Sequence, residues 1–156
     1  MPTTTFRTIV NRDRTQGEVL NFPMCSLRFL ATSEQTAGSV VVLTSAIEPG
    51  QSIPLHSKQQ METSYVVSGK IRFQHGDDLI DVEAGGGTTS PAGQAYGYRN
   101  IGDTTAHLVH VIVGGAFDEF ARESAPLFTD PVANQDRLMD VFVRHGMTFI
   151  APEIAG

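Results

Sequence analysis

The sequence lacks several features that would assign a protein to a class at once. Among its 156 residues there is one cysteine and no tryptophan. The single cysteine, Cys25, excludes an internal disulfide, and the apolar stretch that follows it, Leu27 to Leu30, predicts a buried and unreactive thiol. No apolar run approaches about 18 residues, and the N-terminus lacks an apolar leader. We therefore expect a soluble, cytoplasmic protein with no membrane partner.

Positive charge is also scarce. The chain has 11 Lys and Arg against 17 Asp and Glu, which gives a net charge of −6. No block of basic residues occurs, and phosphate backbones are bound by concentrated basic surfaces, so we expect no nucleic-acid partner. With 40% apolar and 18% charged residues the composition is that of an ordinary globular protein, and the length fits one domain over residues 1–156.

Short β-rich runs separated by turn residues fill most of the chain. The clearest is Ser39 to Ala46, which is too short and too rich in β-branched residues for a helix. Turn residues follow it at Glu48-Pro49-Gly50, and Gly76-Asp77-Asp78 predicts a hairpin turn. Many short strands with regular turns predict an all-β sandwich or barrel. The other expected strands are Ser26–Ala31, Met61–Val67, Lys70–His75, Leu79–Val82, Tyr96–Arg99 and His107–Val113.

A helical pattern begins only after Gly114-Gly115. Apolar residues at helical spacing predict a helix over Ala116–Phe128. Thr129-Asp130-Pro131 predicts the start of a second helix, which should run to about His145 with Gly146 as its C-terminal cap. We therefore expect a barrel core over about residues 26–114 and a helical C-terminal tail over about 115–150.

Two stretches of the chain form a recognisable pair. The first, Gly50 to Gly69, contains His56 and Glu62, and the second, Gly85 to Asn100, contains Pro91 and Gly93. Together they resemble the paired signature of the cupin superfamily. The flanking segments, Leu27–Thr32 and Arg144–Gly146 with Ala151-Pro152, resemble small single-domain cupins described as quercetin-dioxygenase-like. The resemblance implies a jelly-roll β-barrel (a double-stranded β-helix), a metal site inside it, and a homodimer, which an exposed sheet edge would also favour.

The chain departs from this family pattern at the metal site. The resemblance places four metal ligands at positions 56, 58, 62 and 96, but two histidines of the pattern are Lys58 and Tyr96 here. His56 and Glu62 remain as metal ligands. A lysine binds metal only after losing a proton of pKa about 10.4. We therefore expect weak or absent metal binding and no cofactor; if a metal does bind, it would be divalent Zn, Ni, Fe or Mn.

Strand parity places the same residues inside the barrel. Residues two apart on a strand share a face, so His56 and Lys58 point the same way, as do Tyr96 and Tyr98. The Lys58 ammonium could then pair with Glu62 and supply the positive charge of the missing metal. His107 and His110 have opposite parity, and we expect His110 to face inward. We expect His75 and His145 in solvent, and a mainly apolar enclosure formed by Leu55, Met61, Val66, Phe73 and Tyr98.

Three functions remain open at this point, and whether the protein is an enzyme is one of the open questions. The first is a small-molecule-binding cupin of unknown substrate with an altered metal site, in which Lys58, Glu62, Tyr98 and His110 contact the ligand. The second is a metal-independent isomerase or epimerase with His56 as the base and Tyr96 as the acid. The third is a metal-dependent, dioxygenase-like cupin that uses His56, Glu62 and a further ligand.

Overall fold

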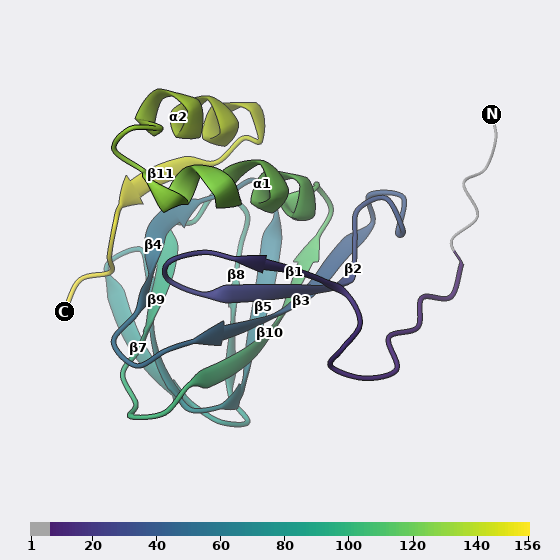
Figure 1. Ribbon diagram of the computed structural model, residues 1–156. Helices are drawn as coiled ribbons and strands as arrows, with labels where there is room; N and C mark the ends of the chain where they lie inside the picture. The colour runs from purple at the N-terminus through teal and green to yellow at the C-terminus, as the bar shows by residue number, and fades with distance from the viewer. Residues whose placement is uncertain (1–6) are drawn as a thin grey trace.

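Two antiparallel sheets enclose the core of the protein (Figure 1). The structure, a computed structural model, describes residues 7–156. The first sheet has the order β1 (Glu18–Asn21), β2 (Ser26–Ala31), β3 (Val40–Ile47), β10 (Ala106–Val113), β5 (Met61–Ser68) and β8 (Gly87–Ser90). The second has the order β11 (Thr148–Ala151), β4 (Ser52–Ser57), β9 (Tyr96–Asn100), β6 (Lys70–His75) and β7 (Asp78–Glu83). This mostly-β architecture is that of a jelly-roll barrel, as the sequence predicts.

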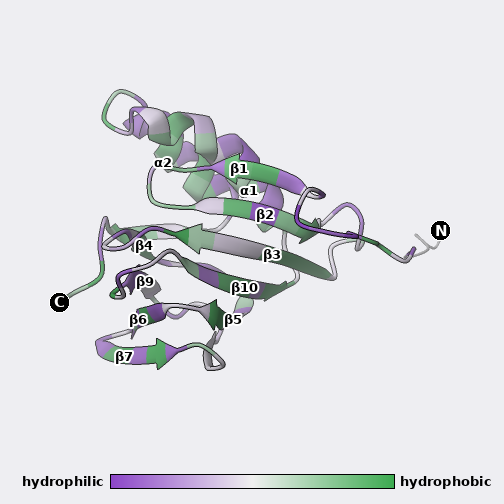
Figure 2. Cartoon of the chain, turned by 60° about the horizontal axis from the view of Figure 1, so that its bottom comes forward, coloured by the Kyte–Doolittle hydropathy of each residue, from purple (hydrophilic) through white to green (hydrophobic). Residues whose placement is uncertain are grey.

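Alternation along the strands decides which side chains enter the barrel. In β3 every second residue is buried, and in β5 the buried positions are Glu62, Ser64 and Val66. Figure 2 shows the resulting apolar stretches on β2, β3 and β10, between more polar loops. The hydrophobic core between the sheets is a cluster of buried residues from both of them: Ile47, Val66, Ile71, Phe73, Tyr96, Tyr98, Ala106 and Leu108.

The helices of the described residues all follow Gly114, which confirms the predicted change of pattern. They are α1 (Phe117–Ser124), a 3-10 helix (Ala125–Thr129) and α2 (Gln135–Arg144). The first expected helix changes to 3-10 geometry at Ala125 because Pro126 has no N–H to donate. Gly146 follows α2 with a φ of +66°, so its role at the end of that helix is confirmed.

Two boundaries of the helical region were predicted wrongly. The second helix begins at Gln135 and not near Pro131, because Asp130 accepts hydrogen bonds from the N–H groups of Ala133 and Asn134 and so holds a turn there. The expected helical tail to about residue 150 also fails, since Thr148–Ala151 is strand β11 and pairs with β4. Four residues are too few to show a periodicity in the sequence. This strand forms because its backbone pairs with the free edge of β4.

The helices gather over one end of the barrel, next to β11 and β4 (Figure 1). They form their own apolar cluster of Phe120, Leu127, Leu138, Val141, Phe142 and Met147. Among residues 7–156 no helix is long and apolar enough to cross a membrane. Strands β1 and β8 lie at the edges of the first sheet, and the expected homodimer stays a prediction that sedimentation at micromolar concentration would test.

Candidate ligand-binding pocket

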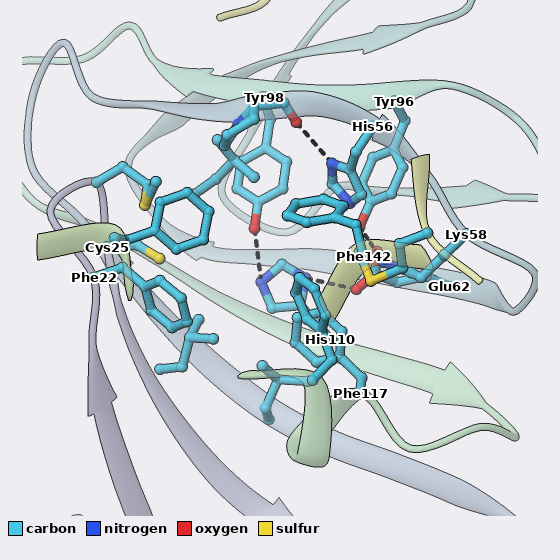
Figure 3. Close-up of a pocket in the computed structure, with 18 residues that line it drawn as sticks. Phe22, Cys25, His56, Lys58, Glu62, Tyr96, Tyr98, His110, Phe117 and Phe142 are labelled. Carbon is cyan, nitrogen blue, oxygen red and sulfur yellow. Dashed lines mark hydrogen bonds and ion pairs between the residues drawn. The ribbon is translucent and has the colours of Figure 1, made fainter. Parts of the chain in front are cut away.

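A cavity lies between the interior of the barrel and the helices, and every candidate site residue of the sequence analysis lines it (Figure 3). Its volume, counted as space that the centre of a water molecule can occupy, is about 80 Å³, several times the room that one water needs. One part, here called the polar floor, consists of His56, Lys58, Glu62, Tyr96, Tyr98 and His110. The other, here called the aromatic wall, consists of Phe22, Phe117, Phe120, Phe128 and Phe142.

The predicted enclosure was largely wrong. Of its five residues only Tyr98 lines the cavity. Met61 is 44% exposed, while Val66 and Phe73 are fully buried in the hydrophobic core between the sheets. The helices supply the wall instead, together with Phe22 in the β1–β2 turn, whose ring lies 5.6 Å from that of Phe128. Phe117 and Phe120 lie in the segment predicted as the first helix, whereas no sequence pattern connects Phe22 or Phe142 to the site.

Neighbouring strands bring the polar floor together. His56 on β4 is the cross-strand partner of Tyr96 on β9, and their ring centroids are 4.8 Å apart. Lys58 lies just beyond β4, where its carbonyl accepts a hydrogen bond of 2.7 Å from Gly93 N–H. Glu62 enters from β5, and His110 enters from the adjacent β10. Both motif stretches of the sequence therefore contribute to one site.

Lys58 forms the centre of the polar floor. Its Nζ donates to Glu62 Oε2 at 3.0 Å and to Tyr96 Oη at 2.9 Å, so the pairing predicted between Lys58 and Glu62 is confirmed. The Lys58 and Glu62 side chains are only 3% and 5% exposed. Burial alone would raise the pKa of the Glu62 carboxyl, but the Lys58 charge and the nearby His110 hold it below its usual value. Nζ also lies 5.1 Å from the centre of the Phe117 ring, within cation–π range.

His56 is a neutral imidazole with one nitrogen engaged. Its Nδ1 donates to the Pro54 carbonyl at 2.7 Å, which fixes the tautomer and leaves Nε2 as the acceptor. The Nδ1 contact is the hydrogen bond of the His56 ring within residues 7–156, and Nε2 faces the cavity lining without one. Burial, and then the charge of Lys58, lower the pKa of His56 to about 4. The ring can thus accept a proton or a hydrogen bond from a molecule in the cavity.

His110 is buried like His56 but has both ring nitrogens occupied. Ser64 Oγ lies 2.8 Å from Nδ1 and Ser45 Oγ lies 2.8 Å from Nε2, while Tyr98 Oη is 3.5 Å from Nε2. Burial lowers the pKa of His110 and raises that of Tyr98 well above its usual value. These two residues are consequently neutral, and their hydrogen bonds to the barrel fix the shape of the floor.

The residues present do not fit the metal ion that the family pattern implies. Lys58 Nζ already contacts an oxygen of Glu62 and the hydroxyl of Tyr96, two of the four ligand positions. A fixed ammonium there repels a cation, and it keeps the Glu62 oxygen in use. Within residues 7–156, no three His, Cys, Asp or Glu side chains are grouped so that they could hold an ion.

Both histidines that were expected in solvent are partly or fully covered. His75 is 8% exposed; its Nδ1 lies 3.0 Å from Ser90 Oγ, and its ring stacks against Tyr96 with the centroids 6.0 Å apart. It shares parity with Ile71 and Phe73, so strand alternation could have placed it inside. The His145 side chain is 16% exposed, and its Nε2 lies 3.0 Å from Glu123 Oε1.

The chain matches a known family over the part that supplies the polar floor. Residues 43–112, from β3 to β10, match the family model described as Cupin domain. This match, together with the jelly-roll fold that the solved structures below share, supports a small cupin. No curated protein sequence matches the chain.

Several solved structures share the fold at low sequence identity. An RmlC-like cupin from Shewanella frigidimarina is 15% identical with a TM-score of 0.63, over 74% of this chain and 99% of that one. The polyketide cyclase RemF from Streptomyces resistomycificus is 18% identical with a TM-score of 0.59, over 68% and 80%. A predicted oxalate decarboxylase from Thermotoga maritima is 21% identical with a TM-score of 0.56, over 58% and 80%. At these identities the similarity establishes the fold alone.

Proposed function

We propose that this cupin binds a small molecule, and that the Lys58 ammonium takes the place that a metal ion holds in metal-binding cupins. One observation carries the proposal: Lys58 Nζ lies between Glu62 and Tyr96 at the floor of a cavity whose remaining lining is mainly aromatic and aliphatic. A mainly apolar cavity with a few convergent polar groups is the usual form of a ligand site.

The chemistry of the ammonium supports this role. Lysine has three N–H donors, and Glu62 and Tyr96 engage two of them, which leaves one for a ligand. Burying an ion pair costs free energy of solvation that the pairing only partly returns. Well-packed apolar residues of similar volume at these positions would stabilise the barrel equally well. The retained pair is therefore better explained by binding than by stability.

Acetophenone, a ring with one carbonyl oxygen, is a suitable probe. We expect calorimetry to show binding that is unchanged after treatment with a chelator, and elemental analysis to find far less than one metal ion per chain. Lys58→His, which restores the His-x-His spacing, should raise zinc or nickel affinity by more than about tenfold. Lys70→His, at an exposed lysine on β6, is the matched control. Stoichiometric metal that survives chelation, or loss of acetophenone binding with the metal, would overturn the proposal.

A second candidate is metal-independent acid–base catalysis, and the free Nε2 of His56 favours it. In this scheme His56 removes a proton from the carbon next to a ligand carbonyl, the Lys58 N–H holds the enolate oxygen, and Tyr96 or the protonated His56 returns a proton. In D₂O the protein would then exchange the methyl protons of acetophenone for deuterium. We would expect His56→Gln to remove this exchange and His107→Gln, at an exposed position, to leave it intact. Exchange at the solvent rate supports binding without catalysis.

A further inference from the structure

We propose that the ligand is an uncharged, largely aromatic molecule with one carbonyl or hydroxyl oxygen, and that the pocket excludes carboxylates and sugars. The inference rests on the proposed function and names its ligand class. It follows from the charge of the polar floor, from the composition of the aromatic wall and from the number of polar atoms left free.

The polar floor has no net charge to offer an anion. Lys58 and Glu62 are the only formally charged residues among those that line the cavity, and they are in contact at 3.0 Å. His110 has both nitrogens bonded to serine hydroxyls, and His56 donates to a backbone carbonyl. A carboxylate entering the cavity would lose its hydration next to the like charge of Glu62, and Lys58 is already shared. A neutral oxygen avoids both costs.

The aromatic wall favours a flat apolar body. Phe120 packs edge-on against Phe142 with centroids 5.1 Å apart, and Phe117 lies 5.7 Å from Phe120. These rings leave edges and faces on which another ring can pack at the usual 4.5–7 Å. A sugar would bury several hydroxyls against this wall without hydrogen-bond partners, and each unpaired hydroxyl is costly.

The free polar atoms match a single oxygen. The third N–H of Lys58 can donate to a carbonyl or hydroxyl oxygen, and His56 Nε2 can accept from a hydroxyl. Glu62 Oε2 and Tyr96 Oη contact Lys58, and the His110 nitrogens contact Ser45 and Ser64. The second carboxylate oxygen, Glu62 Oε1, lies 3.8 Å from His110 Nδ1, and its negative charge disfavours an anion beside it. One hydroxyl oxygen between Lys58 and His56 would satisfy both of these groups, whereas a carbonyl oxygen would satisfy the Lys58 N–H alone.

Three molecules of nearly equal shape test the inference: acetophenone (neutral, one oxygen), benzoate (anionic) and ethylbenzene (no oxygen). In calorimetric titrations of the whole protein at pH 7.5 we expect acetophenone to bind about tenfold more tightly than ethylbenzene, because it gains a charge-assisted hydrogen bond. Benzoate should bind at least tenfold more weakly than acetophenone. Benzoate binding equal to or tighter than acetophenone binding would overturn the inference, and equal affinity for acetophenone and ethylbenzene would refute the role of Lys58.

A double variant, Lys58→Met with Glu62→Gln, sharpens the test because it removes the ammonium and keeps the floor neutral. It should bind ethylbenzene as the wild type does and acetophenone no better than ethylbenzene. Retained preference for acetophenone would contradict the assignment of the oxygen to Lys58. If the double variant does not fold, the three wild-type titrations still test the proposed ligand class. Failure of all three molecules to bind the wild type would refute the proposed function itself, which separates that outcome from an error in ligand class.

Discussion

The polar floor and the aromatic wall line the same cavity but are held in different ways. The floor comes from strands of both sheets, and each polar side chain in it depends on one or two specific partners, as Lys58 does on Glu62 and Tyr96. The wall comes mainly from the helical segment after Gly114 and is held by ring contacts and buried area. Loss of one partner in the floor leaves a buried charge, whereas loss of one ring in the wall leaves a hole. We therefore expect a sharp response in the floor and a graded, local one in the wall.

The largest effect should come from breaking the floor's ion pair on one side only. Lys58→Met leaves Glu62 buried without its cation, which we expect to lower the free energy of unfolding by about 3–5 kcal/mol. The double variant with Glu62→Gln removes both charges and should recover most of that loss. Denaturant unfolding followed by circular dichroism measures both, and Lys70→Met, at an exposed pair, is the control. Equal destabilisation by the single and double variants would show that packing, and not charge, holds the floor.

In the wall, Phe142→Ala should cost about 3 kcal/mol, because Phe142 is 5% exposed and packs against Phe120 and Phe149. We expect the loss to be local: amides of α1 and α2 should lose hydrogen-exchange protection while those of β3 and β10 keep theirs. Met139→Ala, at a position 46% exposed on α2, is the control. Equal loss of protection in the helices and the barrel would mean that the wall and the floor unfold as one unit, which would contradict a local response in the wall.

The same contrast explains what could be predicted from the sequence. Strand alternation placed His56, Glu62, Tyr96 and His110 inside the barrel, because residues two apart share a face. Lys58 lies just beyond β4, and its position followed from the motif spacing. The wall was missed because it is formed by segments that are distant in sequence, the β1–β2 turn and the helices. Their contacts follow from how β11 pairs with β4 and how α2 packs against β11, which no local pattern encodes.

Acid should weaken the floor through His56. In the unfolded chain His56 takes up a proton below its usual pKa of 6.5, whereas in the fold burial lowers that pKa to about 4. Between these values the unfolded state binds more protons, so the free energy of unfolding falls as the pH falls, by about 3 kcal/mol in all. Unfolding measured at pH 7 and pH 4.5 should show this loss, and His56→Gln should reduce it. An unchanged pH dependence in His56→Gln would place the acid sensitivity elsewhere.

The smallest effect concerns Cys25, which lines the cavity where the wall meets the barrel and is only half-buried. Burial raises the pKa of its thiol to about 12, so at pH 8 very little thiolate exists to react. We expect an aromatic disulfide reagent to modify the native protein at least about a hundredfold more slowly than the protein unfolded in guanidinium, and acetophenone to slow it further by occupying the cavity. If Phe142→Ala loosens the wall locally, it should speed the reaction, while the Lys58→Met/Glu62→Gln double variant should not. Fast modification of the native wild type at pH 8 would show that the wall opens readily to the reagent. The wall would then differ from the floor in its mobility as well as in its side-chain chemistry.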